Sequence, residues 1–348
     1  MEVLQAARVL GLSIISFLVA LSLTPVVVRI LLKFNFAKQI RSRESAPIFF
    51  ELHKAKENTP TMGGIVIWAT VLLLALIFFT LSSLLGGTFS YLNFVDRAQT
   101  YLPLAAISIA AFLGLLDDLA GVFRIGPNGG GLKVSQKLVV YILLALIGGL
   151  WFYYRLDWNV LYLPFFGNVN IGWWYIPIFM FIITASAFSA NETDGLDGLL
   201  GGVALFTFVA LTVVAFALGR YDLATFSGVT VGALLAFLWF NIYPARFFMG
   251  DTGSMALGIT IGVIAMLTNT ALFLPFFAPI LVIESLSVII QVISKKLFGR
   301  KVFLSAPIHH HFEALGWPES QVTMRFWIIS AVFSALGISL YFISRFFQ

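Results

Sequence analysis

The stretch YLPLAAISIAAFLGLLDD, residues 101–118, is an uncharged, apolar run that ends in two adjacent carboxylates, Asp117 and Asp118. A run of this length approaches the roughly 20 apolar residues that a membrane-spanning helix needs. The two acids repel each other, and at the C-terminal end of a helix they also oppose the helix dipole. We therefore predict a spanning helix whose end lies beside a cation, with a divalent metal and its phosphate ligands as the leading candidates.

The rest of the chain repeats the apolar pattern. Of its 348 residues 60% are hydrophobic, well above the share in a soluble domain, and only 11% are charged. We predict an all-α polytopic membrane protein that forms a single domain over residues 1–348. Ten apolar stretches predict ten transmembrane helices, at residues 10–32, 62–84, 101–117, 138–154, 174–190, 199–218, 224–242, 255–272, 277–298 and 326–344.

The positive charges predict the orientation. With the N-terminus outside, 16 of the 21 Lys and Arg residues fall at the inner face, which is the bias that the positive-inside rule describes. Both termini are then expected on the outer, periplasmic side. All four histidines and most of the acids also fall at the inner face, so we predict one cytoplasmic site built from loops far apart in the sequence.

Two absences in the sequence narrow the chemistry. The chain has no cysteine, which excludes disulfides and thiolate metal sites. It also has no Gly-x4-Gly-Lys-Ser/Thr motif, so coupling to ATP hydrolysis is not expected.

Three polar segments at the inner face carry the functional hypothesis. Residues 56–64 (KENTPTMGG) combine a Lys, hydroxyls and a glycine pair that opens a helix and suits a phosphate, although for this segment alone an ordinary turn with a Thr cap is favoured. Asp194 and Asp197 are spaced i, i+3 before a helix, where capping competes with a functional role. Residues 239–254 (WFNIYPARFFMGDTGS) offer amide, cation, carboxylate and aromatic rings at one helix start.

Residues in and after the ninth predicted span are also candidates. Consecutive histidines at 309–311 point in different directions and cannot readily close on one metal, so phosphate or nucleotide contacts are favoured over zinc. Glu284 and Gln291 are seven residues apart and share a helix face. An acid at membrane depth is a functional candidate, with a bond to a neighbouring helix as the alternative.

Read together, these segments resemble the phospho-N-acetylmuramoyl-pentapeptide transferases, the MraY family of bacterial peptidoglycan synthesis. Seven ordered motifs along nearly the whole chain carry the resemblance: TPTMGG (59–64), GLLDD (114–118), TDGLDG (193–198), FNIYPA (240–245), FMGDTGS (248–254), LSVIIQV (286–292) and APIHHHFE (306–313). The wider superfamily of polyprenyl-phosphate sugar-1-phosphate transferases shares the aspartate motifs. The triple histidine points to this branch.

The resemblance implies a Mg²⁺-dependent reaction at the cytoplasmic face of the bacterial inner membrane. Undecaprenyl phosphate and UDP-N-acetylmuramoyl-pentapeptide would give lipid I and UMP. Both substrates are anionic, so cations must lie between them. Membrane lipid is an expected partner, nucleic acid is not, and the oligomeric state is left open between a monomer and a homodimer.

The resemblance also implies the site residues. Asp117, Asp118, Asp251 and His310 are the expected catalytic residues, with Asp118 and Asp251 as metal ligands. The expected substrate-binding residues are Lys56, Thr59, Lys133, Lys137, Asn191, Asp194, Asp197, Asn241, Phe248, Gln291, His309 and His311.

The chain departs from the family pattern at four places. Phe188 stands where members usually have Asn, with Glu192 gained nearby. Gly121 replaces a usual Lys, Ser135 a usual basic residue, and Asn58 a usual Gly. The changes at Phe188 and Gly121 put substrate contacts in question and leave the aspartate assignments intact.

Two other readings compete with this one. The first is a sibling transferase that uses another UDP-sugar. The second is a polytopic transporter, although the predicted spans offer little polar path beyond Glu284 and Gln291.

Overall fold

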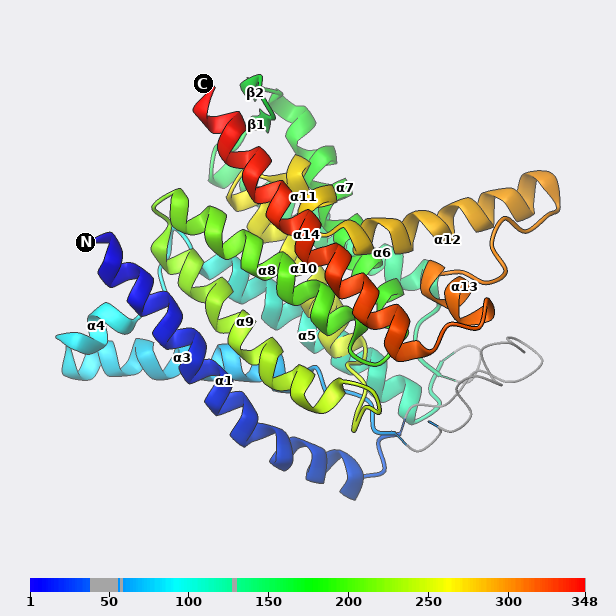
Figure 1. Ribbon diagram of the computed structural model, residues 1–348. Helices are drawn as coiled ribbons and strands as arrows, with labels where there is room; N and C mark the ends of the chain where they lie inside the picture. The colour runs from blue at the N-terminus through cyan, green and yellow to red at the C-terminus, as the bar shows by residue number, and fades with distance from the viewer. Residues whose placement is uncertain (38–55, 57–58, 127–129, 348) are drawn as a thin grey trace.

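The computed structural model describes residues 1–37, 56, 59–126 and 130–347, and shows a bundle of α-helices with one small hairpin (Figure 1). The helices of the described chain are α1 (Glu2–Lys33), α3 (Ile65–Leu85), α4 (Thr88–Leu92), α5 (Tyr101–Val122), α6 (Val134–Arg155), α7 (Tyr175–Thr193), α8 (Leu199–Ala217), α9 (Tyr221–Asn241), α10 (Asp251–Leu267), α11 (Leu274–Phe277), α12 (Pro279–Phe298), α13 (Ile308–Ala314) and α14 (Glu319–Phe346). Two short 3-10 turns, Gly172–Trp174 and Ala271–Phe273, precede α7 and α11.

Helix α10 lies inside the bundle, packed against α5 and α7 (Figure 1). Every residue from Thr252 to Leu267 is buried, so this helix is surrounded by protein. Its glycines bring α7 close, since a Cβ at Gly258 would lie 2.7 Å from the carbonyl oxygen of Ser186. Small residues permit such close packing between membrane helices. The polar N-terminal end of α10 is thereby held at a fixed place among its neighbours.

Eight helices in the described residues are long and apolar enough to cross a membrane, namely α1, α3, α5, α6, α7, α8, α9 and α14. The chain is therefore a multi-pass membrane protein, as predicted. The other two predicted spans differ from simple helices. Helix α10 has 17 residues, and at 1.5 Å per residue it is about 25 Å long. The ten-span count stays a prediction.

The ninth predicted span is bent. Residues Ala271–Phe277 and Pro279–Phe298 meet at an angle of 93°. The bend falls at Pro279, which has no N–H to continue the hydrogen bonds of α11. Helix α12 therefore turns away from the bundle, with α13 below it in the view of Figure 1.

One small sheet makes the prediction of an all-α chain wrong in detail. Strands β1 (Val160–Leu163) and β2 (Gly167–Asn170) pair antiparallel, with Val160 opposite Asn170 and Leu163 opposite Gly167. The turn between them uses positive φ at Phe165 and Gly167. Pairing satisfies the backbone polar groups of a connection that would otherwise leave them open.

The two ends of the chain lie at the same end of the bundle. Arg8 near the start of α1 forms an ion pair with Asp222 at the start of α9. Tyr162 of β1 bonds to Ser344 near the end of α14, with 2.7 Å between their hydroxyl oxygens. Arg220, just before α9, donates to the carbonyl of Leu267, and Asn269 just beyond accepts from the Tyr162 N–H at 2.9 Å. These contacts join the starts of α1 and α9 to the ends of α10 and α14.

Candidate active site

Asp118 holds the N-terminal end of α10. Its Oδ1 accepts the N–H of Asp251 at 3.0 Å, and its Oδ2 accepts the N–H of Thr252 at 2.9 Å. These N–H groups have no partner within their own helix, and the helix dipole favours a negative charge beside them. The carboxylate that opposes the dipole of α5 is therefore stabilised by the dipole of α10.

Two glycines permit this contact between α5 and α10. A Cβ at Gly114 would lie 2.3 Å from the carbonyl oxygen of Asp251, so only glycine lets the two backbones approach this closely. Gly250 has φ of +76°, and a Cβ there would lie 2.6 Å from Oδ2 of Asp118. Both glycines lie inside the motifs that the sequence singled out.

The Lys137 ammonium lies between two carboxylates. Its Nζ is 2.9 Å from Oδ2 of Asp117 and 2.7 Å from Oδ2 of Asp251. Asp117 also accepts the N–H of Leu132, and Asn191 of α7 donates to the second oxygen of Asp251. Buried charges are tolerated when they are paired and hydrogen-bonded in this way. The cation that the adjacent aspartates required is thus present within the chain.

This donor set is compatible with Mg²⁺. Among the described residues no three His, Asp or Glu side chains form a metal-binding group. Mg²⁺ is, however, usually held by one or two carboxylates together with substrate phosphates and water. Asp117 and Asp251 already converge on one cation, the Lys137 ammonium, so two carboxylates are available for a metal shared with a substrate.

A second polar cluster surrounds Lys56. Its Nζ is 2.7 Å from Oδ1 of Asp197 and 2.6 Å from Oε1 of Glu319 at the start of α14. The same Glu319 oxygen accepts the N–H of Asp197 at 2.7 Å. The Lys56 ammonium also lies 5.7 Å from the ring centre of Tyr243 and 5.8 Å from that of Phe248. A cation, an acid pair and partly exposed rings are therefore gathered beside the 248–254 segment.

Asn241 fastens the loops around this cluster. Its Oδ1 accepts the N–H of Gly198 at 3.0 Å, and its Nδ2 donates to the carbonyl of Phe247 at 2.8 Å. The side chain is buried. Its position connects the end of α9 to the loop before α8, and both ends of its amide already bond to protein.

The three consecutive histidines have three different environments. His309 is completely buried, and its Nδ1 lies 3.0 Å from Oε2 of the equally buried Glu284. Burial lowers the pKa of His309, but the Glu284 carboxylate outweighs burial, so the pKa lies above its ordinary value. The predicted direct contact of His309 with substrate is therefore not supported by its position.

The other two histidines are partly exposed. His310 Nδ1 lies 2.6 Å from Oε2 of Glu313. His311 Nδ1 accepts the N–H of Leu304 at 3.2 Å. The prediction that the three rings would point in different directions is confirmed.

Gln291 also bonds within the protein. Its Oε1 accepts the N–H groups of Val302 and Phe303, each at 3.0 Å, and its Nε2 donates to the carbonyl of Phe303 at 3.0 Å. The Gln291 side chain therefore holds the connection between α12 and α13 in place. A uridine contact by this amide would require it to share or exchange these bonds.

Residues 191–198 connect the three clusters. Asn191 bonds to Asp251, Gly195 packs against the ring of His309, and Asp197 bonds to Lys56. Most of the predicted residues are thus brought to one end of the bundle by one short segment. Thr59 and Asp194 are partly exposed, and Lys133 has an exposed side chain just before α6.

The departures from the family pattern are accommodated without strain. A Cβ at Gly121 would meet nothing within 4 Å, so the usual Lys is replaced by open space. Ser135 is exposed, and Phe188 packs against the hydrophobic core. Asn58 lies outside the described residues.

The structure adds Glu313 and Glu319 to the residues that the sequence singled out. Glu313 is the partner of His310, and Glu319 is the partner of both Lys56 and Asp197. Glu313 was visible as the end of the APIHHHFE motif, where i, i+3 spacing places it beside His310. Nothing in the sequence marked Glu319, which precedes an apolar helix like any first-turn acid.

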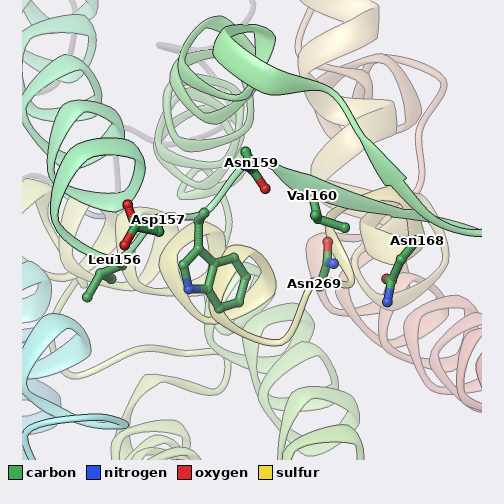
Figure 2. Close-up of a pocket in the computed structure, with 7 residues that line it drawn as sticks. Leu156, Asp157, Asn159, Val160, Asn168 and Asn269 are labelled. Atoms are coloured by element: carbon green, nitrogen blue, oxygen red, sulfur yellow. The ribbon is translucent and has the colours of Figure 1, made fainter.

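A separate pocket of about 320 Å³ lies at the opposite end of the bundle (Figure 2). Figure 2 shows its labelled lining residues: Leu156, Asp157, Asn159, Val160, Asn168 and Asn269. They come from the connection after α6, from the hairpin and from the turn after α10. This pocket contains none of the predicted site residues, so it is separate from the cluster around Lys137.

Comparison with known proteins agrees with the motifs. Residues 100–269 match the model of glycosyl transferase family 4, and residues 56–67 match signature 1 of the phospho-N-acetylmuramoyl-pentapeptide-transferases. The phospho-N-acetylmuramoyl-pentapeptide-transferase of Geobacillus sp. strain WCH70 is 39% identical over 338 residues, which cover 96% of this chain and 98% of that protein. The protein of the same name from Clostridium perfringens strain SM101 is 38% identical, over 97% of this chain and 99% of its own length.

Proposed function

Because the chain belongs to the phospho-N-acetylmuramoyl-pentapeptide transferase family, we propose that the residues around Lys137 are the active site of its reaction. The enzyme transfers a phospho-N-acetylmuramoyl-pentapeptide group from a UDP-linked donor to a polyprenyl phosphate, giving lipid I and UMP. Undecaprenyl phosphate is the proposed acceptor. The observation that carries the site assignment is the convergence of Asp117 and Asp251 on one cation at the N-terminus of α10.

The transfer exchanges one phosphoanhydride for another. An oxygen of the acceptor phosphate attacks the phosphorus that bears the sugar, a new P–O bond forms, and the P–O bond to UMP breaks. The electron pair of that bond leaves with UMP, so no ATP is required. The main obstacle is repulsion between two anionic substrates, which positioned cations and helix N-termini reduce.

Mg²⁺, when bound, would neutralise charge on the donor diphosphate and on the developing UMP. Asp251 would hold it, with Asp118 beside it at the start of α10. Asp117 is placed to orient the acceptor phosphate or to take a proton from it. We propose these roles from the carboxylate positions, and the requirement for Mg²⁺ is part of the same proposal.

Lys137 would serve as a resident cation, paired with carboxylates in the free enzyme and with substrate phosphates in the complex. In the structure its ammonium neutralises Asp117 and Asp251. The flexible Lys137 side chain could turn toward substrate phosphates, which would leave Asp251 to hold Mg²⁺ and Asp117 to meet the acceptor phosphate. This exchange keeps the site near charge balance before and after substrate binding.

The donor nucleotide is assigned to the side of the site formed by Phe248 and Lys56. Phe248 is partly exposed next to the metal-binding segment, and an aromatic ring suits stacking on a planar base. His310 on α13 is assigned to the donor phosphates, since Glu313 fixes its Nδ1 and so orients its Nε2. Both assignments are proposals that agree with the family motifs.

We place this end of the bundle at the cytoplasmic face of the bacterial inner membrane. The argument is the concentration of Lys and Arg in the loops at this end. Both termini then lie on the periplasmic side. A homodimer stays a prediction.

The decisive experiment is a UMP-release assay on the purified enzyme in detergent with undecaprenyl phosphate and Mg²⁺. UDP-N-acetylmuramoyl-pentapeptide is expected to release UMP, and UDP-N-acetylglucosamine is not. Release only with the second donor would favour a sibling transferase. Asp251→Asn is expected to lower turnover by about 10²-fold or more, and near-normal turnover would remove Asp251 from the chemistry.

A further inference from the structure

Glu284 and His309 form an isolated buried pair beside the proposed site. Both side chains are completely buried, and the Nδ1 of His309 lies 3.0 Å from the Oε2 of Glu284. The backbone N–H of His309 also faces that carboxylate oxygen, at 3.5 Å. Neither side chain is open to solvent or substrate, so the pair cannot act by contact with the reacting groups.

The pair joins three segments that are distant in sequence. Glu284 belongs to α12 and His309 to α13, while the other face of the imidazole meets the loop before α8. A Cβ at Gly195 would lie 2.2 Å from Nε2 of His309, so the ring fits against this loop only because residue 195 is glycine. The His309 ring is therefore a direct contact between α13 and residues 194–198.

The second ring nitrogen of His309 and the second carboxylate oxygen of Glu284 have no hydrogen-bond partner in the described part of the chain. These atoms, Nε2 of His309 and Oε1 of Glu284, are both buried. Polar groups in such a place are costly, and natural proteins keep them where position matters. The single bond between Nδ1 and Oε2 is consequently the polar interaction that holds the ring.

His310 and Asp197 are the groups that this arrangement places. His310 follows His309 on α13, with the two ring centres 4.1 Å apart. Asp197 lies two residues after Gly195 and holds Lys56. A shift of His309 would move the proposed phosphate contact relative to the proposed nucleotide contact.

We propose that Glu284 and His309 are a positioning pair, which acts through His310 by fixing α13 against residues 194–198. This inference rests on the proposed function, because its readout is turnover of the muramoyl-pentapeptide donor. It assigns His309 a role other than substrate contact, and it assigns Glu284 a role in the reaction geometry. The pair sets how well His310 meets the donor phosphates, and so it affects kcat more than the KM for the donor.

The test compares Glu284→Ala, His309→Ala and the double variant in the UMP-release assay, with full-length enzyme in detergent. Each single variant is expected to lose about tenfold to hundredfold in kcat, as partners that orient functional histidines do. The double variant is expected to lose no more than either single variant, because both changes remove the same interaction. Glu284→Gln should recover most of kcat, since its amide oxygen still accepts from Nδ1.

Ser287→Ala is the matched control. Ser287 is buried in the same helix, and its hydroxyl donates to the α12 carbonyl of Glu284 at 2.6 Å. It is expected to keep wild-type kcat. Amide hydrogen exchange of residues 304–316 should be faster in Glu284→Ala and His309→Ala than in this control.

Several results would overturn the inference. These are a kcat in Glu284→Ala equal to that of Ser287→Ala, losses that multiply in the double variant, or a change in KM with kcat intact. If Glu284→Ala fails to fold, His309→Ala with and without Glu284→Gln makes the same comparison. Absence of wild-type turnover would instead refute the proposed function, so the two failures are distinguishable.

Discussion

Replacing Asp118 with asparagine separates anchoring from chemistry in the aspartate pair. The Asp118 carboxylate accepts the N–H groups of Asp251 and Thr252 at 3.0 and 2.9 Å. Asparagine has nearly the same shape but only one acceptor oxygen, and its NH₂ group cannot accept. One buried N–H at the start of α10 therefore loses its acceptor. The other N–H keeps an acceptor, but a neutral amide oxygen replaces the charged carboxylate.

The structure allows the size of the effect to be worked out. A hydrogen bond to a charged acceptor contributes about 1.5–3 kcal/mol, so the two bonds contribute about 3–6 kcal/mol. Asparagine retains one neutral bond of about 1 kcal/mol. Loss of the negative charge at the helix N-terminus costs a further 0.3–1 kcal/mol, roughly. We expect Asp118→Asn to lower the free energy of unfolding by about 2–6 kcal/mol.

The assay is thermal unfolding of the purified enzyme in detergent, followed by intrinsic fluorescence, alongside UMP release. Asp118→Asn should lower Tm by about 5 °C or more and should also abolish most turnover. Asp251→Asn is the matched control, because the bonds of its side chain go to Lys137 and Asn191 and leave the Asp118 anchor intact. A wild-type Tm in Asp118→Asn, with turnover lost, would refute the anchoring role and leave Asp118 a purely chemical one.

Three further perturbations test other parts of the site. Lys137→Met should lower kcat by about 10²-fold, because a cation that faces the substrate phosphates is lost. The same change should tighten Mn²⁺ binding, measured by electron paramagnetic resonance, because Lys137 no longer competes for Asp117 and Asp251. An unchanged Mn²⁺ affinity would argue against a resident cation between these two carboxylates. Gly195→Ala should cost about 1–3 kcal/mol by overpacking against His309, seen as a lower Tm and faster exchange in α13, and a wild-type Tm would mean that the loop adjusts freely. Since the pKa of His309 is raised above 6.5, the stability it provides is complete below pH 6.5 and is lost as pH rises through the raised value. The Tm difference between wild type and His309→Gln should therefore shrink with rising pH, and a constant difference would contradict the ion pair.

The membrane helices were predictable because their signal is local. An apolar run of sufficient length identifies a spanning helix whatever its neighbours are, and eight of the predicted runs are such helices. The limits of these helices were less visible: α14 begins at Glu319 and α1 at Glu2, since polar residues at a membrane boundary continue a helix without changing the apolar pattern. The hairpin at 160–170 was missed because its short strands lie in an aromatic loop without clear alternation.

The site was predictable as a set of residues but not as a set of bonds. The distribution of charged residues over the loops predicted that Asp117, Asp251 and Lys137 lie at one face. In the structure, Lys137 forms ion pairs with both aspartates. The side chains of Asn241 and Gln291 bond to backbone groups of other loops. These bonds depend on how the loops pack together in three dimensions, so no local sequence pattern predicts them. The same holds for Glu319, whose two partners are 122 and 263 residues away.

The shared location of the two termini has a consequence for how many times the chain crosses the bilayer. A chain whose ends lie on one side must cross an even number of times. Eight simple helices satisfy this parity, and adding only the bent α11–α12 pair would make nine and separate the ends. With both termini on the same side of the membrane, as we propose, helix α10 and the bent pair either both count as crossings or neither does. A reporter fused to each terminus should accordingly give the same sidedness.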